Sequence, residues 1–291
     1  MGGGSWTTSS FTSYINTTRA ATASVSLDGT VDYACCNSVQ DMFVARGMDA
    51  ALNPNGVIRE CCDSNEHPCT IPVILALDVT GSMGSAAMEV AKKINVVMTK
   101  LYDEVKDVEF MVMGIGDLAY DRAPIQASQF ESDIRIAEQL DKVYFEGGGG
   151  GNDYESYTAA WYFGSRHTKL DCWNRGKKGI IITMGDEPLN PYLPHKRLAA
   201  VCGDNLQGDI ETGDLYKEVI EKFDVYHLNV KHGYDHYGNK IKFTFGKYLD
   251  DKHLRDVTVN SIANEIVDIV VGATNGNNTQ VATNSDGAIS W

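Results

Sequence analysis

The sequence predicts an α/β fold: a doubly wound, mostly parallel β-sheet with helices on both faces. From residue 71 onward, short apolar runs rich in β-branched residues alternate with stretches of helical periodicity. Strands that are apolar throughout and alternate with helices are typical of a parallel sheet buried on both sides. Acidic residues directly follow several of the runs, at the sheet edge where such folds bind ligands.

Each run and each periodic stretch defines an expected element. Strands are expected at 71–77, 108–115, 179–184 and 225–230, with a short edge strand at 143–145. The helix expected at 86–105 has one apolar face formed by Met88, Ala91, Ile94, Met98, Leu101 and Val105. Further helices are expected at about 132–142, 213–222 and 258–271, and a helical stretch is expected after Glu155, to about Gly164.

Composition divides the chain into three parts. Residues 1–69 are expected to form an N-terminal extension, partly disordered or packed on the domain, since their first thirty residues are mostly small and polar. Residues 70–272 form the main domain. Residues 273–291, rich in Asn, Thr, Gly and Ser, are expected to be a flexible tail.

A polar turn follows the first strand. The run 71–77 ends at Asp78, and two hydroxyls follow at alternate positions, Thr80 and Ser82, before a helical pattern begins. Their three oxygens can converge on one point. Hard oxygen ligands with few charges suit Mg²⁺ or Mn²⁺, with Ca²⁺ as an alternative, better than Zn²⁺. The competing interpretation is that Ser82 only caps the following helix.

The Asp-x-Thr-x-Ser spacing of this turn resembles the metal-ion-dependent adhesion site (MIDAS) of von Willebrand factor A (vWA) domains, in particular intracellular bacterial ones. The resemblance extends over about residues 70–271. It implies a Rossmann-like fold and a further metal-binding aspartate after the fourth strand. Asp186, after the run 180–184, matches that position.

Between these two motifs the family often uses a threonine, and here the chain departs from it. The glycines 147–151 lead into Asn152 and Asp153 instead. We expect Asp153 to be a metal ligand in place of the threonine, with Asn152 as second choice and Thr158 as the nearest threonine. Asn152 and Asp117 are expected beside the direct ligands, where Asp117 would orient a bound water or hydroxyl. The alternative for Asp117 is an ordinary turn aspartate.

The seven cysteines indicate a reducing compartment. Their odd number and two adjacent pairs favour reduced thiols in the cytoplasm. The N-terminus has no secretory pattern, and no apolar run approaches the length of a membrane span. The less favoured interpretation of the N-terminal cysteines is a zinc site formed by Cys35, Cys36, Cys61, Cys62, His67 and Cys69.

The net charge of −14 argues against a nucleic-acid partner, because phosphate binding needs clustered Lys and Arg. His227, His232 and His236 lie close together in the sequence and form a second possible metal site. Their spacing fits neither one helical face nor a zinc finger, so a solvated loop is expected.

The resemblance implies a function of binding rather than of turnover. A vWA domain with a MIDAS is a divalent-cation-dependent protein-binding module, in which an Asp or Glu of the partner completes the coordination of the metal. Some intracellular members work in assemblies that contain AAA ATPases, which indicates the kind of partner. The alternatives are a structural subunit in which the metal braces the loops and, less favoured, a metal-dependent hydrolase.

Overall fold

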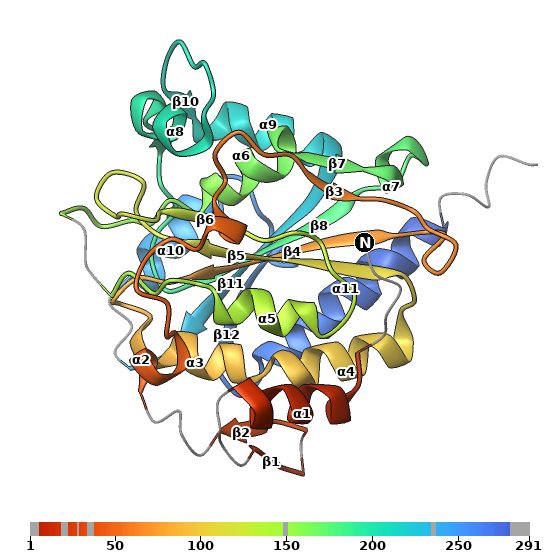
Figure 1. Cartoon of the computed structure of the whole chain (residues 1–291). Helices are drawn as coiled ribbons and strands as arrows, with labels where there is room; N and C mark the ends of the chain where they lie inside the picture. Colours follow the sequence, from red (N-terminus) through yellow and green to blue (C-terminus); the bar gives the residue numbers. More distant parts are fainter. Residues whose placement is uncertain are drawn as a thin grey trace, which may run out of the picture.

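The computed structural model describes residues 6–18, 23–27, 29–33, 38–147, 151–233 and 237–279. Its centre is a six-stranded sheet (Figure 1) with the order β12-β11-β8-β4-β5-β6. The strands are β4 (Ile71–Asp78), β5 (Val108–Ile115), β6 (Ile125–Ala127), β8 (Gly179–Gly185), β11 (Phe223–Lys231) and β12 (Leu254–Thr258). All neighbours are parallel except β6, which runs antiparallel to β5. The predicted fold class is confirmed.

Strand β4 lies in the middle of the sheet and explains its apolar sequence. Val73, Leu75 and Leu77 face one hydrophobic cluster, and the alternate residues Ile74 and Ala76 face the other. Successive side chains of a strand point to opposite faces, so a strand covered on both sides is apolar at every position. The strand therefore delivers Asp78 to the carboxyl edge of the sheet from a fixed, fully packed position.

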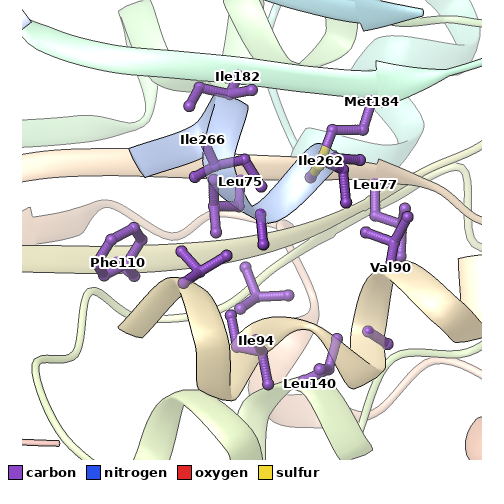
Figure 2. Packing of buried hydrophobic residues seen from close by; sticks show 14 of the residues in the cluster. Leu75, Leu77, Val90, Ile94, Phe110, Leu140, Ile182, Met184, Ile262 and Ile266 are labelled. Atoms are coloured by element: carbon purple, nitrogen blue, oxygen red, sulfur yellow. The ribbon is translucent and has the colours of Figure 1, made fainter. Parts of the chain in front are cut away.

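An aliphatic layer covers one face (Figure 2). It consists of α3 (Gly84–Lys92), α4 (Ile94–Glu104), α5 (Arg135–Asp141) and α11 (Ile262–Thr279). In Figure 2, Ile94 of α4 and Ile266 of α11 lie with Leu75 in the same cluster. Burying aliphatic side chains of this size stabilises the fold by about 1.5–3 kcal/mol each.

An aromatic layer covers the opposite face. It contains α6 (Thr158–Arg166), α8 (His195–Cys202), α9 (Thr212–Lys222) and α10 (Gly238–Phe245). Trp161 and Phe163 of α6 are fully buried there, together with Phe223 and Phe245. Helix α6 lies over the middle of the sheet (Figure 1), where it contacts β4, β5 and β8. Both ends of α6 lie next to clusters of polar side chains.

The described part of the N-terminal extension packs on the domain. Helix α1 (Thr8–Thr18) buries Phe11 and Ile15, and Trp6 Nε1 donates a hydrogen bond to Asn95 Oδ1 on α4, at 3.0 Å. Then follow the hairpin of β1 (Ala23–Val25) and β2 (Val31–Tyr33), helix α2 (Val39–Met42), a 3₁₀ turn (Ala50–Leu52) and β3 (Arg59–Cys61). Strand β3 pairs in parallel with β7 (Thr168–Leu170), directly after α6. The remaining short elements are α7 (Asp171–Asn174), β9 (Tyr192–Leu193) and β10 (Ile210–Glu211).

Several element boundaries differ from the predictions. The helix expected at 86–105 is two helices, separated at Lys93, and α11 continues to Thr279 instead of ending near 271. The edge strand beside β5 is β6, and residues 143–145 form no strand. The Gln126 side chain on β6 explains this, because its amide donates to Tyr144 O and accepts from Tyr144 N, each at 2.7 Å. A side chain thus takes the place of a strand partner for that backbone.

Among the described helices, none combines the length and the apolar character that crossing a bilayer requires.

Candidate metal centre

The loop after β4 folds around the carboxylate of Asp78. Asp78 Oδ1 accepts hydrogen bonds from Thr80 N at 2.9 Å and from Thr80 Oγ1 at 2.6 Å, and Asp78 Oδ2 accepts one from the Tyr157 hydroxyl at 2.7 Å. Asp78 is fully buried, and Thr80 is nearly so. The sequence motif therefore forms a tight turn that fixes both side chains at the edge of the sheet.

Ser82 connects this loop to the end of β8. Its hydroxyl donates to Asp186 Oδ1 at 2.9 Å and lies 3.2 Å from Thr80 Oγ1. Helix α3 begins only at Gly84, after an N-cap residue, Met83, whose side chain makes no capping bond. Helix capping is therefore not the role of Ser82, and that alternative interpretation is wrong. Four of the predicted site residues, Asp78, Thr80, Ser82 and Asp186, form one hydrogen-bonded network.

The spacing of these oxygens fits a small divalent cation. Ligand oxygens 2.0–2.1 Å from an octahedral Mg²⁺ lie about 3 Å from one another. The Thr80 and Ser82 hydroxyls, and the Ser82 hydroxyl and Asp186 carboxylate, are separated by 3.2 and 2.9 Å. Ser82 is exposed, so the network is accessible from solvent on that side. The donor set of hydroxyl and carboxylate oxygens suits Mg²⁺ or Mn²⁺.

His232 fixes the other oxygen of Asp186. Its Nε2 lies 3.0 Å from Asp186 Oδ2, in the loop directly after β11. Hydrogen bonds of this kind hold metal-binding carboxylates in one orientation. Sequence reasoning placed His232 in a solvated loop, and only the parallel pairing of β8 with β11 shows that the two strand ends meet.

The loop that leads into α6 does not have the predicted arrangement, in which Asp153 or Asn152 is a metal ligand. Asp153 forms an ion pair with Lys240 Nζ at 2.9 Å, and Asn152 lies beside the side chain of Tyr154. Thr158, buried at the start of α6, pairs with Asn190 through Oγ1 at 2.6 Å. None of these contacts reaches the network of Asp78, so within the described residues these three side chains do not join it.

Glu155, which the sequence did not single out, does lie beside the site. It is 4% exposed, its Oε2 has no hydrogen-bond partner among the described residues, and its charge interacts with that of Asp78. Asp117 is also buried, with Oδ1 accepting from Ala119 N and Oδ2 unpartnered in the described part of the chain. Glu155 Oε2 and Asp117 Oδ2 are therefore buried carboxylate oxygens without a described partner, and the charges of the two residues interact. Buried oxygens of this kind suit a bound cation.

The raised pKa values of the buried carboxyl groups indicate the same need for a positive charge nearby. Burial, and then the charge of Asp186, raises the pKa of Asp78 to about 7. Burial, and then the charge of Asp78, raises the pKa of Glu155 to about 11 and that of Glu187 to about 7. A cation among these carboxylates would stabilise their ionised forms and so bring the pKa values down.

Tyr157 holds the Asp78 carboxylate from the side of the protein core. Its ring is fully buried, and its hydroxyl also accepts a hydrogen bond from Glu187 N at 3.3 Å. Gly185, the last residue of β8, makes room for it, because a Cβ at that position would overlap the Tyr157 hydroxyl. The side chain is anchored by an edge contact with His227, whose ring centroid is 5.0 Å away.

The other predicted metal sites are not assembled by the described residues. His227 is not in a solvated loop: it is fully buried on β11 and stacked on Phe245 at 3.8 Å between ring centroids. His236, Cys35 and Cys36 lie outside the described residues. The described cysteines are free thiols, as predicted: Cys61, Cys62, Cys69, Cys172 and Cys202.

Comparison with solved structures finds partial likenesses of fold. A pilus adhesin, SpaC from Lactobacillus rhamnosus GG in an open conformation, matches with a TM-score of 0.47 and 13% identity over 74% of this chain and 31% of that one. The vWF domain of the type V pili tip protein Mfa5 from Porphyromonas gingivalis matches with a TM-score of 0.40 and 12% identity, over 76% and 98%. The conserved hypothetical protein BatB from Bacteroides thetaiotaomicron matches with a TM-score of 0.39 and 16% identity, over 69% and 98%.

This chain thus spans about a third of the length of the SpaC chain. One of the similar structures is described as a vWF domain. No protein-family model matches the sequence, and no curated protein matches it. At identities and TM-scores this low, conclusions about function depend on the geometry of the site itself.

Proposed function

We propose that this chain is a divalent-cation-dependent protein-binding module. The observation that carries the proposal is the convergence of the Thr80, Ser82 and Asp186 oxygens, at about 3 Å spacing, beside the buried carboxylate of Asp78. These four residues would hold Mg²⁺ or Mn²⁺, and Ca²⁺ is an alternative. A cation bound there would offer a positive charge to a carboxylate of a partner protein.

Two residues of the network would hold the cation from the buried side, and two would expose it to a partner. Asp78 and Thr80 are buried and fixed by the turn, and Tyr157 prevents the Asp78 carboxylate from rotating. Ser82 and Asp186 lie on the solvent side of the same network. A partner with Asp or Glu at the right position would approach from that side and form a charge-assisted contact, which a partner with Asn or Gln forms less well.

The hydrogen bonds of the site support binding over bracing. The loop after β4 is already tied to the end of β8 by the Ser82–Asp186 bond, and to α6 by the Tyr157–Asp78 bond. The loops therefore have direct protein contacts that a structural metal would otherwise need to supply. A bracing role remains the alternative, and removal of the cation from a braced protein would lower its stability strongly.

Hydrolysis is the less favoured function. The Ser82 hydroxyl donates to a carboxylate, Asp186, rather than to a histidine, and it is shared with Thr80. A nucleophilic serine is activated by a base within hydrogen-bond reach that can carry its proton through the reaction. The arrangement suits coordination better than nucleophilic attack, so we propose a binding protein that is not an enzyme.

Two further parts of the proposal concern the setting. We propose a cytoplasmic location, which agrees with the free thiols. We also propose a protein partner from an assembly, such as one that contains an AAA ATPase.

The test is titration of the full chain with MnCl₂ and MgCl₂ by calorimetry, on the wild type and on Ser82→Ala and Asp186→Ala. We expect saturable binding by the wild type and at least a 100-fold loss of affinity in Asp186→Ala. Both exchanged side chains lie at the solvent edge of the network, so the variants should stay folded. Gln207→Ala, an exposed change elsewhere, is the matched control.

The open coordination position is tested next with Mn²⁺-loaded protein. Bound Mn²⁺ accelerates the relaxation of water protons, and a short peptide with one Glu should displace the bound water and reduce the effect. The same peptide with Gln should not. Wild-type protein that is folded but binds neither cation would refute the proposal, and binding without displacement by the Glu peptide would favour the brace.

A further inference from the structure

A second group of metal-type side chains lies at the other end of α6. His167 directly follows the helix, Cys202 is the last residue of α8, and Asp204 comes two residues later. Their ligand atoms all lie within 4.8 Å of one another. None of these three residues belongs to the network of Asp78, Thr80, Ser82 and Asp186, the strand-end site.

The imidazole of His167 has hydrogen-bond acceptors at both nitrogens. Its Nδ1 lies 3.0 Å from the carbonyl oxygen of Val57, and its Nε2 lies 2.7 Å from Asp204 Oδ2. Because a carbonyl oxygen can only accept, Nδ1 must carry the proton of a neutral ring, which leaves a lone pair on Nε2 facing a carboxylate. That contact requires a positive charge between the two atoms, either a second ring proton or a metal ion.

The His167 ring is oriented as the rings of metal-binding histidines are, with Nδ1 facing a backbone carbonyl and Nε2 facing the other ligands. Such histidines commonly donate their other N–H to a backbone carbonyl, which fixes the tautomer and the ring orientation. Here Val57 O plays that part, and the ring is further held by stacking on Phe163, with centroids 5.1 Å apart. The Tyr162 hydroxyl donates to Asp204 Oδ2 and so orients the carboxylate as well.

The surroundings favour a cation. The C-termini of α6 and α8 both end at the cluster, and helix C-termini carry a partial negative charge. Gly203, with φ 82°, turns the chain sharply enough to place Cys202 and Asp204 together. The Cys202 thiol is completely buried, whereas the Asp204 side chain is 30% exposed and gives access from solvent.

We propose that His167 Nε2, Cys202 Sγ and the Asp204 carboxylate bind a zinc ion. One nitrogen, one sulfur and one oxygen are donors that zinc accepts, at about 2.0–2.3 Å, and water supplies the fourth position. At those bond lengths neighbouring ligand atoms lie about 3.3 Å apart, so the Asp204 and His167 atoms separate by roughly half an ångström on binding. The exposed side of Asp204 permits that movement.

Such a zinc ion would lock the N-terminal extension onto the domain. The turn before β3 is already bound to the same three-residue cluster: Gly56 N donates to Cys202 O at 2.8 Å, and Arg59 N donates to His167 O at 2.8 Å. The imidazole donates to Val57 O between them. Zinc bound there therefore joins α6, α8 and residues 56–59.

The proposal is tested by titrating the reduced full chain with CoCl₂, since Co²⁺ replaces Zn²⁺ and gives a thiolate-to-metal absorption band. We expect one equivalent of Co²⁺ to produce the band, Zn²⁺ to abolish it, and Cys202→Ser to lose it. Asp204→Asn should weaken Co²⁺ binding at least 10-fold while it keeps the thiolate band at saturation. Zinc should also raise the melting temperature of the wild type but not that of Cys202→Ser.

Cys61→Ser and Asp78→Ala are the controls. Cys61 is a buried thiol on β3, and Asp78 belongs to the strand-end site, so both variants should keep the band. A folded wild type without a band would overturn the proposal and leave an imidazolium–carboxylate pair. A band that survives Cys202→Ser and disappears in Cys61→Ser would place the metal elsewhere.

Discussion

The two ends of helix α6 hold polar clusters of opposite chemical character. The nine-residue helix separates them by about 14 Å. At its N-terminal end, Tyr157 contacts Asp78 in a network of hydroxyl and carboxylate oxygens. At its C-terminal end, His167 contacts Asp204 beside a buried thiol. The first set suits hard cations and the second suits zinc.

The difference lies in how the donors are supplied. At the strand-end site, the parallel strands β4 and β8 bring oxygens together at the carboxyl edge of the sheet, where the fold places ligands generally. At the other end, two helix C-termini and one turn of the extension meet off the sheet. The first site therefore depends on the sheet, and the second depends on how the extension packs, so each can be disrupted separately.

The largest effect is expected from Gly185→Ala. The added Cβ would overlap the Tyr157 hydroxyl, and both residues are enclosed by the core, so the variant should lose about 2–3 kcal/mol of stability. Urea unfolding measures this. Gly208→Ala, where a Cβ meets no atom within 4 Å, should change stability by less than about 0.5 kcal/mol. Equal effects in the two variants would contradict the close packing of Tyr157 under the strand-end site.

A pair of hydroxyl deletions compares the two ends directly. Tyr157→Phe removes the donor to fully buried Asp78 and should cost about 2 kcal/mol, because the carboxylate cannot turn to water instead. Tyr162→Phe removes the donor to partly exposed Asp204 and should cost about 1 kcal/mol or less. Chemical denaturation of both variants checks the order, and a larger loss in Tyr162→Phe would reverse the comparison.

His232→Asn tests the orientation of Asp186. Loss of the 3.0 Å contact should weaken Mn²⁺ binding about 10-fold, with little change in stability, because the His232 side chain is partly exposed. His195→Asn breaks a similar but remote pair with Asp209 and should leave Mn²⁺ affinity unchanged. Calorimetric titration of both variants provides the measurement. An unchanged affinity in His232→Asn would remove the histidine from the site.

The hydrogen-bonded network at the ends of β4 and β8 contains four residues that the sequence singled out, because their signals are local. Asp78, Thr80 and Ser82 lie within one turn, and Asp186 follows a strand that could be recognised from its apolar run. The departures involve residues whose role depends on distant packing. Tyr157 reaches Asp78 only because α6 lies across β4 and β8, and His232 reaches Asp186 only because β8 and β11 are neighbours. Glu155, two residues before Tyr157, comes within range of the Asp78 charge through the same packing.

The second cluster could not be predicted for the same reason. His167 and Cys202 are separated by 35 positions and show no metal-site spacing, and the turn at Val57 belongs to the extension. The boundaries of elements were missed where side chains replace backbone pairing, as Gln126 does for Tyr144. In each case a tertiary contact decided what the local pattern left open.

The smallest predicted effect is a pH dependence that belongs to the N-terminal end alone. Burial lowers the pKa of His227, which packs on Tyr157, to about 3 from an ordinary value of about 6.5. The unfolded chain binds a proton at this imidazole in that window and the folded chain does not. The stability that neutral His227 contributes is therefore complete above pH 6.5 and falls toward pH 3. Between pH 6.5 and 5.5 the loss should be about 1 kcal/mol. His227→Gln should abolish this part of the pH slope in urea unfolding, whereas His253→Gln, a change at a partly exposed histidine, should retain it. Identical slopes in the two variants would show that His227 does not contribute.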